Sequence, residues 1–169
     1  MIGKDVRIHE LTQLPEDIII GNHVAIDMGV YISTHTMIGD YVHIAQHVCV
    51  IGGKHGQFIM RDFSNIGAGS KIVVVSDDFT TGMVNPIVPI EYRNLIGKIT
   101  VMDRFTVIGV NSVVMPNVNM HEGSVLGANS LLMEDAEPWT IYVGSPARPI
   151  KKRSKDWILK SYKQLGYDL

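Results

Sequence analysis

The chain has 169 residues, which fits one domain and is short for two. Lys and Arg total 15 and Asp and Glu total 17, and the resulting net charge of −2 argues against a protein whose main partner is a nucleic-acid backbone. Hydrophobic residues make up 46% of the chain, so it can bury a core, yet no uncharged apolar run approaches the roughly 18 residues of a membrane span.

The first fifty residues carry an aliphatic residue at every sixth position, namely Ile2, Ile8, Leu14, Ile20, Ile26, Ile32, Ile38, Ile44 and Val50. The same spacing returns at Met60, Ile66 and Ile72, and again at Met102, Ile108, Val114, Met120, Leu126 and Leu132. Six is neither a helical period nor a simple strand alternation. It predicts a short flat strand, with its aliphatic side chain pointing inward, followed by a corner. Three such sides make a coil of 18 residues, and the coils stack as parallel strands about 4.8 Å apart.

Two segments interrupt the repeat. Residues 51–59 form a short Gly-rich insertion, and residues 77–98 form a long one. Pro86 and Pro89 in the long insertion prevent regular ladder pairing there. A loop of more than roughly 15 residues in a compact domain is usually functional or disordered.

The repeat ends after Leu132, so we predict a parallel β-helix domain over residues 1–137 and an extension over residues 138–169. Residues 154–165 (SKDWILKSYKQL) predict a terminal α-helix, with Ser154 as its N-cap and Gly166 as its stop. Such a helix would cover the open end of the stack, where bare strand edges invite aggregation.

The hexads, with the segments IGVNSVVMPNVNMHEGSVLGANSLL and PWTIYVGSPARPIKKR, resemble the hexapeptide-repeat acyltransferases. The long insertion, SDDFTTGMVNPIVPIEY, is similar to that of sugar acetyltransferases encoded with bacterial surface-polysaccharide genes. The resemblance implies an all-β fold, a left-handed parallel β-helix with a long loop insertion and a C-terminal α-helix. It also implies a homotrimer that uses acetyl-CoA as co-substrate, needs no metal, and acetylates a hydroxyl or an amine of a sugar.

The resemblance assigns a coenzyme site to the last coils. Acetyl-CoA carries a long arm that needs a narrow slot with regularly spaced backbone amides, and small residues let the arm approach closely. By their positions in the family motifs, the slot would be lined by Gly109, Val110, Gly127 and Ala128. Arg148 and Lys151 match the basic positions that contact the phosphates.

Acyl transfer needs a base for the acceptor's proton. His43 directly precedes the inward Ile44, so it faces out of a coil, where a neighbouring subunit could complete a site. The family's loop histidine has no counterpart here, because the corresponding stretch contains Asp77 and Asp78. Either carboxylate could orient His43 as the base, or Asp78 could itself act or position the acceptor. An amino sugar near neutrality could instead attack unaided.

The acceptor sugar would be nucleotide-linked or part of a surface polysaccharide. His55, close to His43 in the sequence, is a candidate substrate-binding residue in the first insertion. Asn85 and Tyr92 in the second insertion could bond sugar hydroxyls, and Tyr92 could also stack on the ring.

Two other function classes remain open. Gamma-class carbonic anhydrases share the β-helix and bind a metal through three histidines, which His43, His47 and His55 could supply. A non-catalytic sugar-binding β-helix is the second alternative. The N-terminal residues have no apolar signal core, and the single cysteine, Cys49, excludes an internal disulfide, so we expect a reducing, cytoplasmic location without a membrane span.

Overall fold

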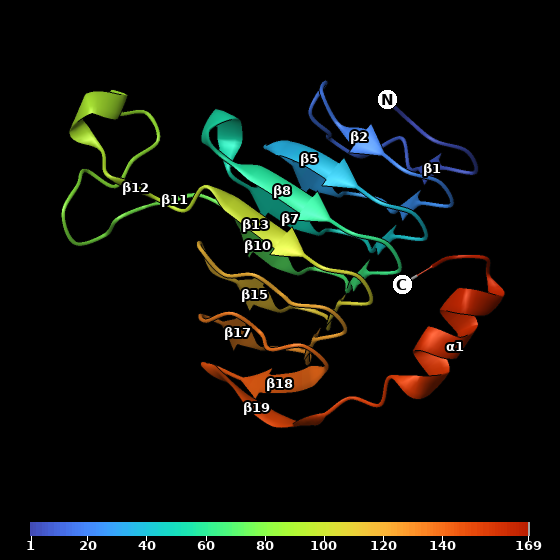
Figure 1. Cartoon of the computed structure of the whole chain (residues 1–169). Coiled ribbons are helices and arrows are strands. Elements are labelled where there is room, and N and C mark those ends of the chain that lie inside the picture. The colour runs from blue at the N-terminus through green and yellow to red at the C-terminus, as the bar shows by residue number, and fades with distance from the viewer. Residues whose placement is uncertain (169) are drawn as a thin grey trace.

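The computed structural model describes residues 1–168 and consists of stacked three-sided coils, with one arm and one helix outside the stack (Figure 1). The strands of one coil pair with strands 18 residues further along the chain. Arg7 pairs with Ala25 and Ile8 with Ile26, in parallel register. This offset is three hexads, so the predicted coil of three sides is confirmed.

The coils build three parallel sheets, which we call A, B and C. Sheet A contains β2 (Ile19–Ile20), β5 (His35–Ile38), β8 (Gln57–Met60) and β13 (Ile99–Met102). Sheet B contains β1 (Arg7–Ile8), β3 (Ala25–Ile26), β6 (His43–Ile44), β9 (Asn65–Ile66), β14 (Val107–Ile108), β16 (Val125–Leu126), β18 (Thr140–Gly144) and β19 (Ala147–Lys152). Sheet C contains β4 (Tyr31–Ile32), β7 (Cys49–Ile51), β10 (Lys71–Val73), β15 (Val113–Val114) and β17 (Leu131–Leu132).

The hexad aliphatics fill the space between the three sheets. Ile44, Ile66 and Ile72 are completely buried, as the inward prediction requires. At the corner between sheets B and C, the hydroxyls of Ser70, Ser112 and Ser130 bond the backbone of the next coil. Ser112 Oγ donates to the carbonyl of Gly127 at 2.7 Å and accepts from the amide of Ser130 at 3.2 Å. Each coil therefore fixes the next through both apolar contact and hydrogen bonds.

Both insertions leave the stack at the corner between sheets C and A. The first contains the 3₁₀-helix η1 (Gly53–His55) and is shorter than predicted, because Gln57–Met60 already form β8. The second projects away from the coils as an arm (Figure 1). It contains β11 (Ser76–Asp77), the 3₁₀-helix η2 (Ile90–Tyr92) and β12 (Leu95–Ile96). The strands β11 and β12 pair antiparallel over two residues each.

The C-terminal extension continues the stack before it forms the helix. Strand β18 pairs parallel with β16, so sheet B runs past the expected boundary at residue 137, and β19 adds an antiparallel edge. The helix α1 (Asp156–Gln164) begins two residues after Ser154, and no side chain caps it. Gly166 has a φ of +86°, consistent with its predicted role as a stop. None of the helices in residues 1–168 is long and apolar enough to cross a membrane.

The helix does not cover the open end of the stack, so that prediction is wrong. It packs along the corner between sheets A and B, where Tyr41, Phe63 and Phe105 have φ angles between 55° and 64°. Tyr162 on the helix meets the rings of Phe63 and Phe105 edge-on, at centroid distances of 5.2 and 5.1 Å. The helix therefore shields the rings of this corner from water, which stabilises its position there.

Candidate active site

The corner between sheets B and C carries a column of stacked glycines. Gly67, Gly109 and Gly127 each follow the inward aliphatic residue of their coil. A Cβ atom on Gly67 would lie 2.7 Å from the amide nitrogen of Val110, and one on Gly109 would lie 2.5 Å from that of Ala128. Glycine is therefore required here to leave the amides of the next coil uncovered.

Those uncovered amides have no hydrogen-bond partner in the described part of the chain. Within residues 1–168, the backbone N–H groups of Ala68, Val110 and Ala128 donate no hydrogen bond. We call these three groups the amide row. The predicted coenzyme residues Gly109, Val110, Gly127 and Ala128 all belong to this corner. At the corner between sheets A and B, the amides of Asn22 and Asp40 bond to the side chains of Asp40 and Asp62. The amides of Asp62, Arg104 and Glu122 there also donate no hydrogen bond within residues 1–168, but no glycine precedes them, so the amide row is distinguished by its bare backbone. An unpaired row of donors is suited to an extended ligand with carbonyl groups.

The two predicted phosphate contacts lie at one end of this column, on β19. Arg148 pairs with Val143, and Val143 is the residue that a Cβ on Gly127 would touch. Lys151 pairs with Ile141 on the same strand pair. The Arg148 guanidinium lies 4.0 Å from Glu134, but both side chains are mostly exposed. Such a pair is weak, so a phosphate can compete for Arg148.

His43 lies further along the same sheet, on β6. Five strand spacings of about 4.8 Å, or roughly 24 Å, separate β6 from β19. Nε2 of His43 donates to Oδ2 of Asp27 at 2.9 Å. Nδ1 lies 2.9 Å from Oδ1 of Asn65, which is a hydrogen bond when the imidazole is doubly protonated or when the amide is turned to present its nitrogen. The cluster of Asp27, His43 and Asn65 therefore fixes the ring.

Within one protomer, neither Asp77 nor Asp78 orients His43, because both belong to the arm and Asp27 takes that place. Both carboxylate oxygens of Asp77 accept from Arg93, at 2.8 and 3.1 Å. Asp78 accepts from Thr81, and from the hydroxyl and amide of Thr80 at 2.7 and 2.8 Å. The bonds from the two threonines, that from the Thr81 hydroxyl foremost, lower the pKa of Asp78. A carboxylate with a lowered pKa is a weaker general base.

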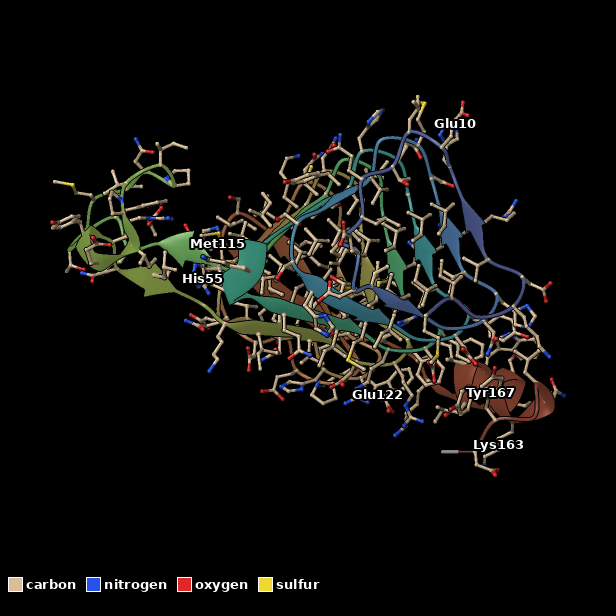
Figure 2. The ribbon with its side chains drawn as sticks, turned by 90° about the horizontal axis from the view of Figure 1, so that it is seen from above. Glu10, His55, Met115, Glu122, Lys163 and Tyr167 are labelled. Carbon is tan, nitrogen blue, oxygen red and sulfur yellow. The ribbon has the colours of Figure 1, made fainter. Side chains whose placement is uncertain are left out.

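The three predicted substrate contacts all lie at the corner between sheets C and A. His55 ends η1 and is exposed, and Figure 2 shows it at the root of the arm. Tyr92 ends η2 in the arm and is 61% exposed. Asn85 is less available, since its Oδ1 accepts from the amide of Ile87 at 2.9 Å. Within one protomer, these residues are therefore separated from His43 by the whole width of sheet C.

Sequence reasoning missed Asp27, Asn65 and Arg93. Asn65 lies in strand β9 and Asp27 directly follows strand β3. The hexad repeat predicts that both residues lie on sheet B close to His43. Asn65 aligns with His43 in neighbouring strands, and Asp27 lies two positions past Ala25, the partner of His43 on β3. Arg93 had no such signal, because the arm has no repeat.

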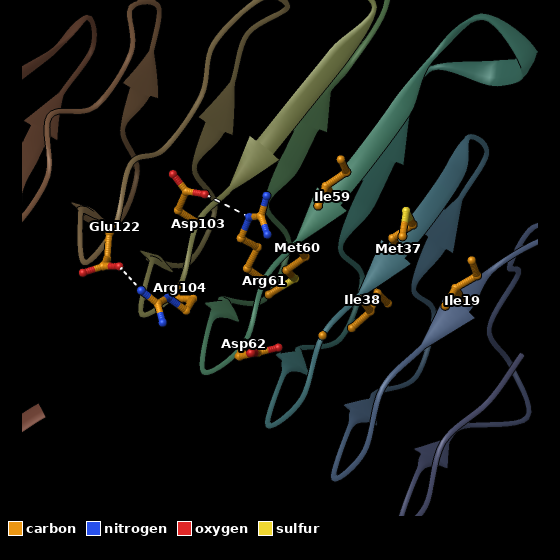
Figure 3. Close-up of a pocket in the computed structure, with 11 residues that line it drawn as sticks. Ile19, Met37, Ile38, Ile59, Met60, Arg61, Asp62, Asp103, Arg104 and Glu122 are labelled. Atoms are coloured by element: carbon orange, nitrogen blue, oxygen red, sulfur yellow. Dashed lines mark hydrogen bonds and ion pairs between the residues drawn. The ribbon is translucent and has the colours of Figure 1, made fainter. Parts of the chain in front are cut away.

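The outer face of sheet A carries an open groove of about 560 Å³ (Figure 3). Its floor is apolar, with Ile19, Met37 and Ile59. Two ion pairs flank it, Arg61 with Asp103 at 3.1 Å and Arg104 with Glu122 at 2.8 Å. None of the predicted site residues lines this groove.

No three His, Cys, Asp or Glu side chains of the described chain converge on a metal position. The histidines considered for a carbonic anhydrase lie apart in one protomer. His43 is on β6, His47 is at the corner between sheets B and C, and His55 is in the first insertion.

No protein-family model matches the sequence. The sequence does match individual proteins. The chain is 37% identical over 161 residues to a dTDP-4-amino-4,6-dideoxy-D-glucose acyltransferase of Escherichia coli, an alignment that covers 91% of this chain and 82% of the relative. Its fold matches that of AntD, an N-acyltransferase from Bacillus cereus solved with dTDP and coenzyme A. The TM-score is 0.92 at 33% identity, over 98% of this chain and 89% of AntD.

The chain belongs to the hexapeptide-repeat acyltransferases. A further structure, a hexapeptide-repeat acetyltransferase from Vibrio cholerae, shares the fold at a TM-score of 0.60 and 21% identity, over 90% of this chain and 73% of that one. The resemblance drawn from the hexads and the tail motif is thereby confirmed. The acyltransferase family is supported over a carbonic anhydrase and over a non-catalytic β-helix.

Proposed function

We propose that this acyltransferase moves an acetyl group from acetyl-CoA to the amino group of a nucleotide-linked sugar. The amide row carries the proposal, because it offers three unpaired donors at coil spacing between a basic end and a histidine. The E. coli relative is named for a dTDP-linked 4-amino sugar, and AntD has been solved with such a sugar and coenzyme A. Both names support an amine rather than a hydroxyl as the acceptor.

In this proposal acetyl-CoA lies along the column of Gly67, Gly109 and Gly127. Arg148 and Lys151 bind its phosphates. Carbonyl groups of the coenzyme's pantetheine chain accept hydrogen bonds from the backbone amides of Val110 and Ala128. The thioester then lies toward β9 and β6, which brings it near His43. The glycines allow the close approach that these hydrogen bonds need.

His43 is the proposed general base, oriented by Asp27. A sugar amine that arrives protonated must lose a proton before it attacks, and His43 can accept it when Asn65 yields to the substrate. His55, Tyr92 and Asn85 are proposed to contact the acceptor. The tetrahedral oxyanion would be stabilised by a backbone amide, for which Ala68 is available.

We propose a left-handed winding and a homotrimer, both typical of the family. The apolar floor of the sheet A groove supports a subunit interface, since Ile19 and Met37 are 37% and 38% exposed in one protomer. The arm adds exposed apolar residues, among them Phe79 and Ile87. A neighbouring subunit could then bring the Asp77 and Asp78 region of its arm to the coenzyme column. We also propose that the protein is a cytoplasmic bacterial enzyme of surface-polysaccharide synthesis.

The test is acetyl transfer by the purified protein. The first acceptor is dTDP-4-amino-4,6-dideoxyglucose, and the control is dTDP-6-deoxyglucose, which has a hydroxyl at the same carbon. Release of the free CoA thiol gives the rate, and mass spectrometry of the sugar nucleotide shows the added acetyl group. We expect transfer to the amine and none above background to the hydroxyl.

Calorimetric titration with CoA separates the two halves of the proposal. Binding of CoA without transfer to any nucleotide-linked amino sugar would reject the acceptor class. No heat on titration with CoA would reject the coenzyme column itself.

A further inference from the structure

We infer that Arg93 is a positioning residue that fixes the acceptor-binding arm, with Asp77 as its anchor. The inference rests on the proposed function, because the arm carries Asn85 and Tyr92, two of the three proposed acceptor contacts. The arm has little structure of its own. Strands β11 and β12 contribute two residues each, and no residue between 78 and 98 is fully buried. A hairpin this short is not stable alone.

The pair of Asp77 and Arg93 is the best-shielded polar contact of the arm. The Arg93 side chain is 14% exposed and that of Asp77 is 10% exposed. Nε donates to Oδ1 at 2.8 Å and Nη2 to Oδ2 at 3.1 Å, in the two-pronged geometry that fixes both side chains. These hydrogen bonds raise the pKa of Arg93 above its usual value. The pair joins β11 to the residue that follows η2.

The same guanidinium also reaches the tip of the arm. Nη1 of Arg93 donates to the carbonyl of Pro86 at 3.4 Å. Pro86 follows Asn85 directly, and Arg93 follows Tyr92 directly. One side chain therefore links the base of the arm to the two segments that carry the proposed acceptor contacts.

One backbone bond, from the amide of Met83 to the carbonyl of Tyr92 at 3.1 Å, also joins the two sides of the arm, and the turns within residues 83–93 carry short-range bonds of their own. The remaining polar contacts lie at the base of the arm. The amide of Asp78 donates to the carbonyl of Asn94 at 2.7 Å, and the side-chain nitrogen of Asn94 donates to Thr81 at 3.0 Å. They hold residues 78–81 against residue 94 but do not reach Pro86. Loss of Arg93 should thus leave the coils and the coenzyme column unchanged and release the tip.

The first readout needs no substrate. Arg93→Met and Arg93→Lys are compared with the wild-type chain in limited proteolysis by chymotrypsin, which can cut after Phe79 and Tyr92. The control is Glu91→Gln, an exposed arm residue without an ion pair in the described structure. We expect Arg93→Met to be cut at least tenfold faster in the arm at an unchanged melting temperature, and Arg93→Lys to lie between. Equal cutting of Arg93→Met and the control overturns the inference.

The second readout is steady-state kinetics with acetyl-CoA and dTDP-4-amino-4,6-dideoxyglucose. Arg93→Met should raise KM for the sugar nucleotide at least tenfold and leave KM for acetyl-CoA within twofold, with partial rescue in Arg93→Lys. An unchanged KM for the sugar, or an equal rise in both KM values, overturns the positioning role. If the wild-type chain binds CoA but acetylates no such sugar, the proposed function fails, and proteolysis alone decides whether Arg93 holds the arm.

Discussion

The amide row makes a strong prediction for Gly109→Ala. The new methyl carbon would lie 2.5 Å from the amide nitrogen of Ala128 and 2.8 Å from the carbonyl carbon of Gly127. Both are backbone atoms, so they cannot turn aside as a side chain would. The methyl group therefore covers the Ala128 donor, and a carbonyl of the CoA arm loses its hydrogen bond.

The expected loss of affinity follows from that one bond. A hydrogen bond is worth about 0.5–1.5 kcal/mol net, and a buried partner left unpaired costs about 1–3 kcal/mol. A loss of about 1–2 kcal/mol raises Kd for CoA by about 5- to 30-fold. Isothermal titration calorimetry with CoA measures it directly.

Gly21→Ala is the matched control. A methyl carbon there would lie 2.6 Å from the carbonyl carbon and oxygen of Gly39, at the corner between sheets A and B. Both variants should lose stability through overpacking, by about 1–3 kcal/mol, which thermal unfolding measures. Only Gly109→Ala should weaken CoA binding. The reasoning is refuted if Gly109→Ala binds CoA normally, or if Gly21→Ala weakens binding equally, since the effect would then come from distorted coils.

Three further predictions concern the basic end, the histidine and the helix. Arg148→Ala should raise Kd for CoA, and an unchanged Kd removes Arg148 from the phosphate site. His43→Ala should lower kcat by about 10²-fold or more, and Asp27→Asn by less with an altered pH profile; normal turnover of His43→Ala excludes it as the base. Burial raises the pKa of Tyr167 to about 12, with help from its bond to Asp40, so the stability it contributes is complete below its ordinary value of 10.0 and is lost as pH rises through about 12. The difference in melting temperature between the wild type and Tyr167→Phe should be constant below pH 10 and should shrink as the pH rises toward about 12; a difference that does not change with pH would contradict this prediction.

The coils could be predicted from the sequence because each one repeats the same physical requirement. Ile26, Ile44 and Ile66 face the same core, and each must be aliphatic for its coil to close. The corner residues follow the same logic, so Gly109 and Gly127 were recognisable as places where the backbone is bare. The coenzyme column is formed by the repeat, so its residues can be predicted from the same pattern.

The helix position was not predictable from α1 alone. Its partner surface is formed by Tyr41, Phe63 and Phe105, which lie 22 and 42 residues apart in the sequence and meet only after the insertions are looped out. Their positive φ angles place the rings on the corner rather than in the core. The helix packs on these rings through Tyr162, which meets Phe63 and Phe105 edge-on, although the open end of the stack directly precedes it in the chain.

The acceptor side resisted prediction for a different reason. From the sequence, Asp77 is a candidate to orient His43, because it lies in the stretch where the family's loop histidine is absent. In the structure its oxygens are committed to Arg93, 16 residues away, across a segment without any periodicity. Each coil repeats the sequence pattern of its neighbours, so one coil helps to identify the next. The arm is held by a single ion pair that has no repeated counterpart in the sequence. The donor is therefore expected to bind where the repeat is regular, and the choice of acceptor depends on the one segment where the repeat is interrupted.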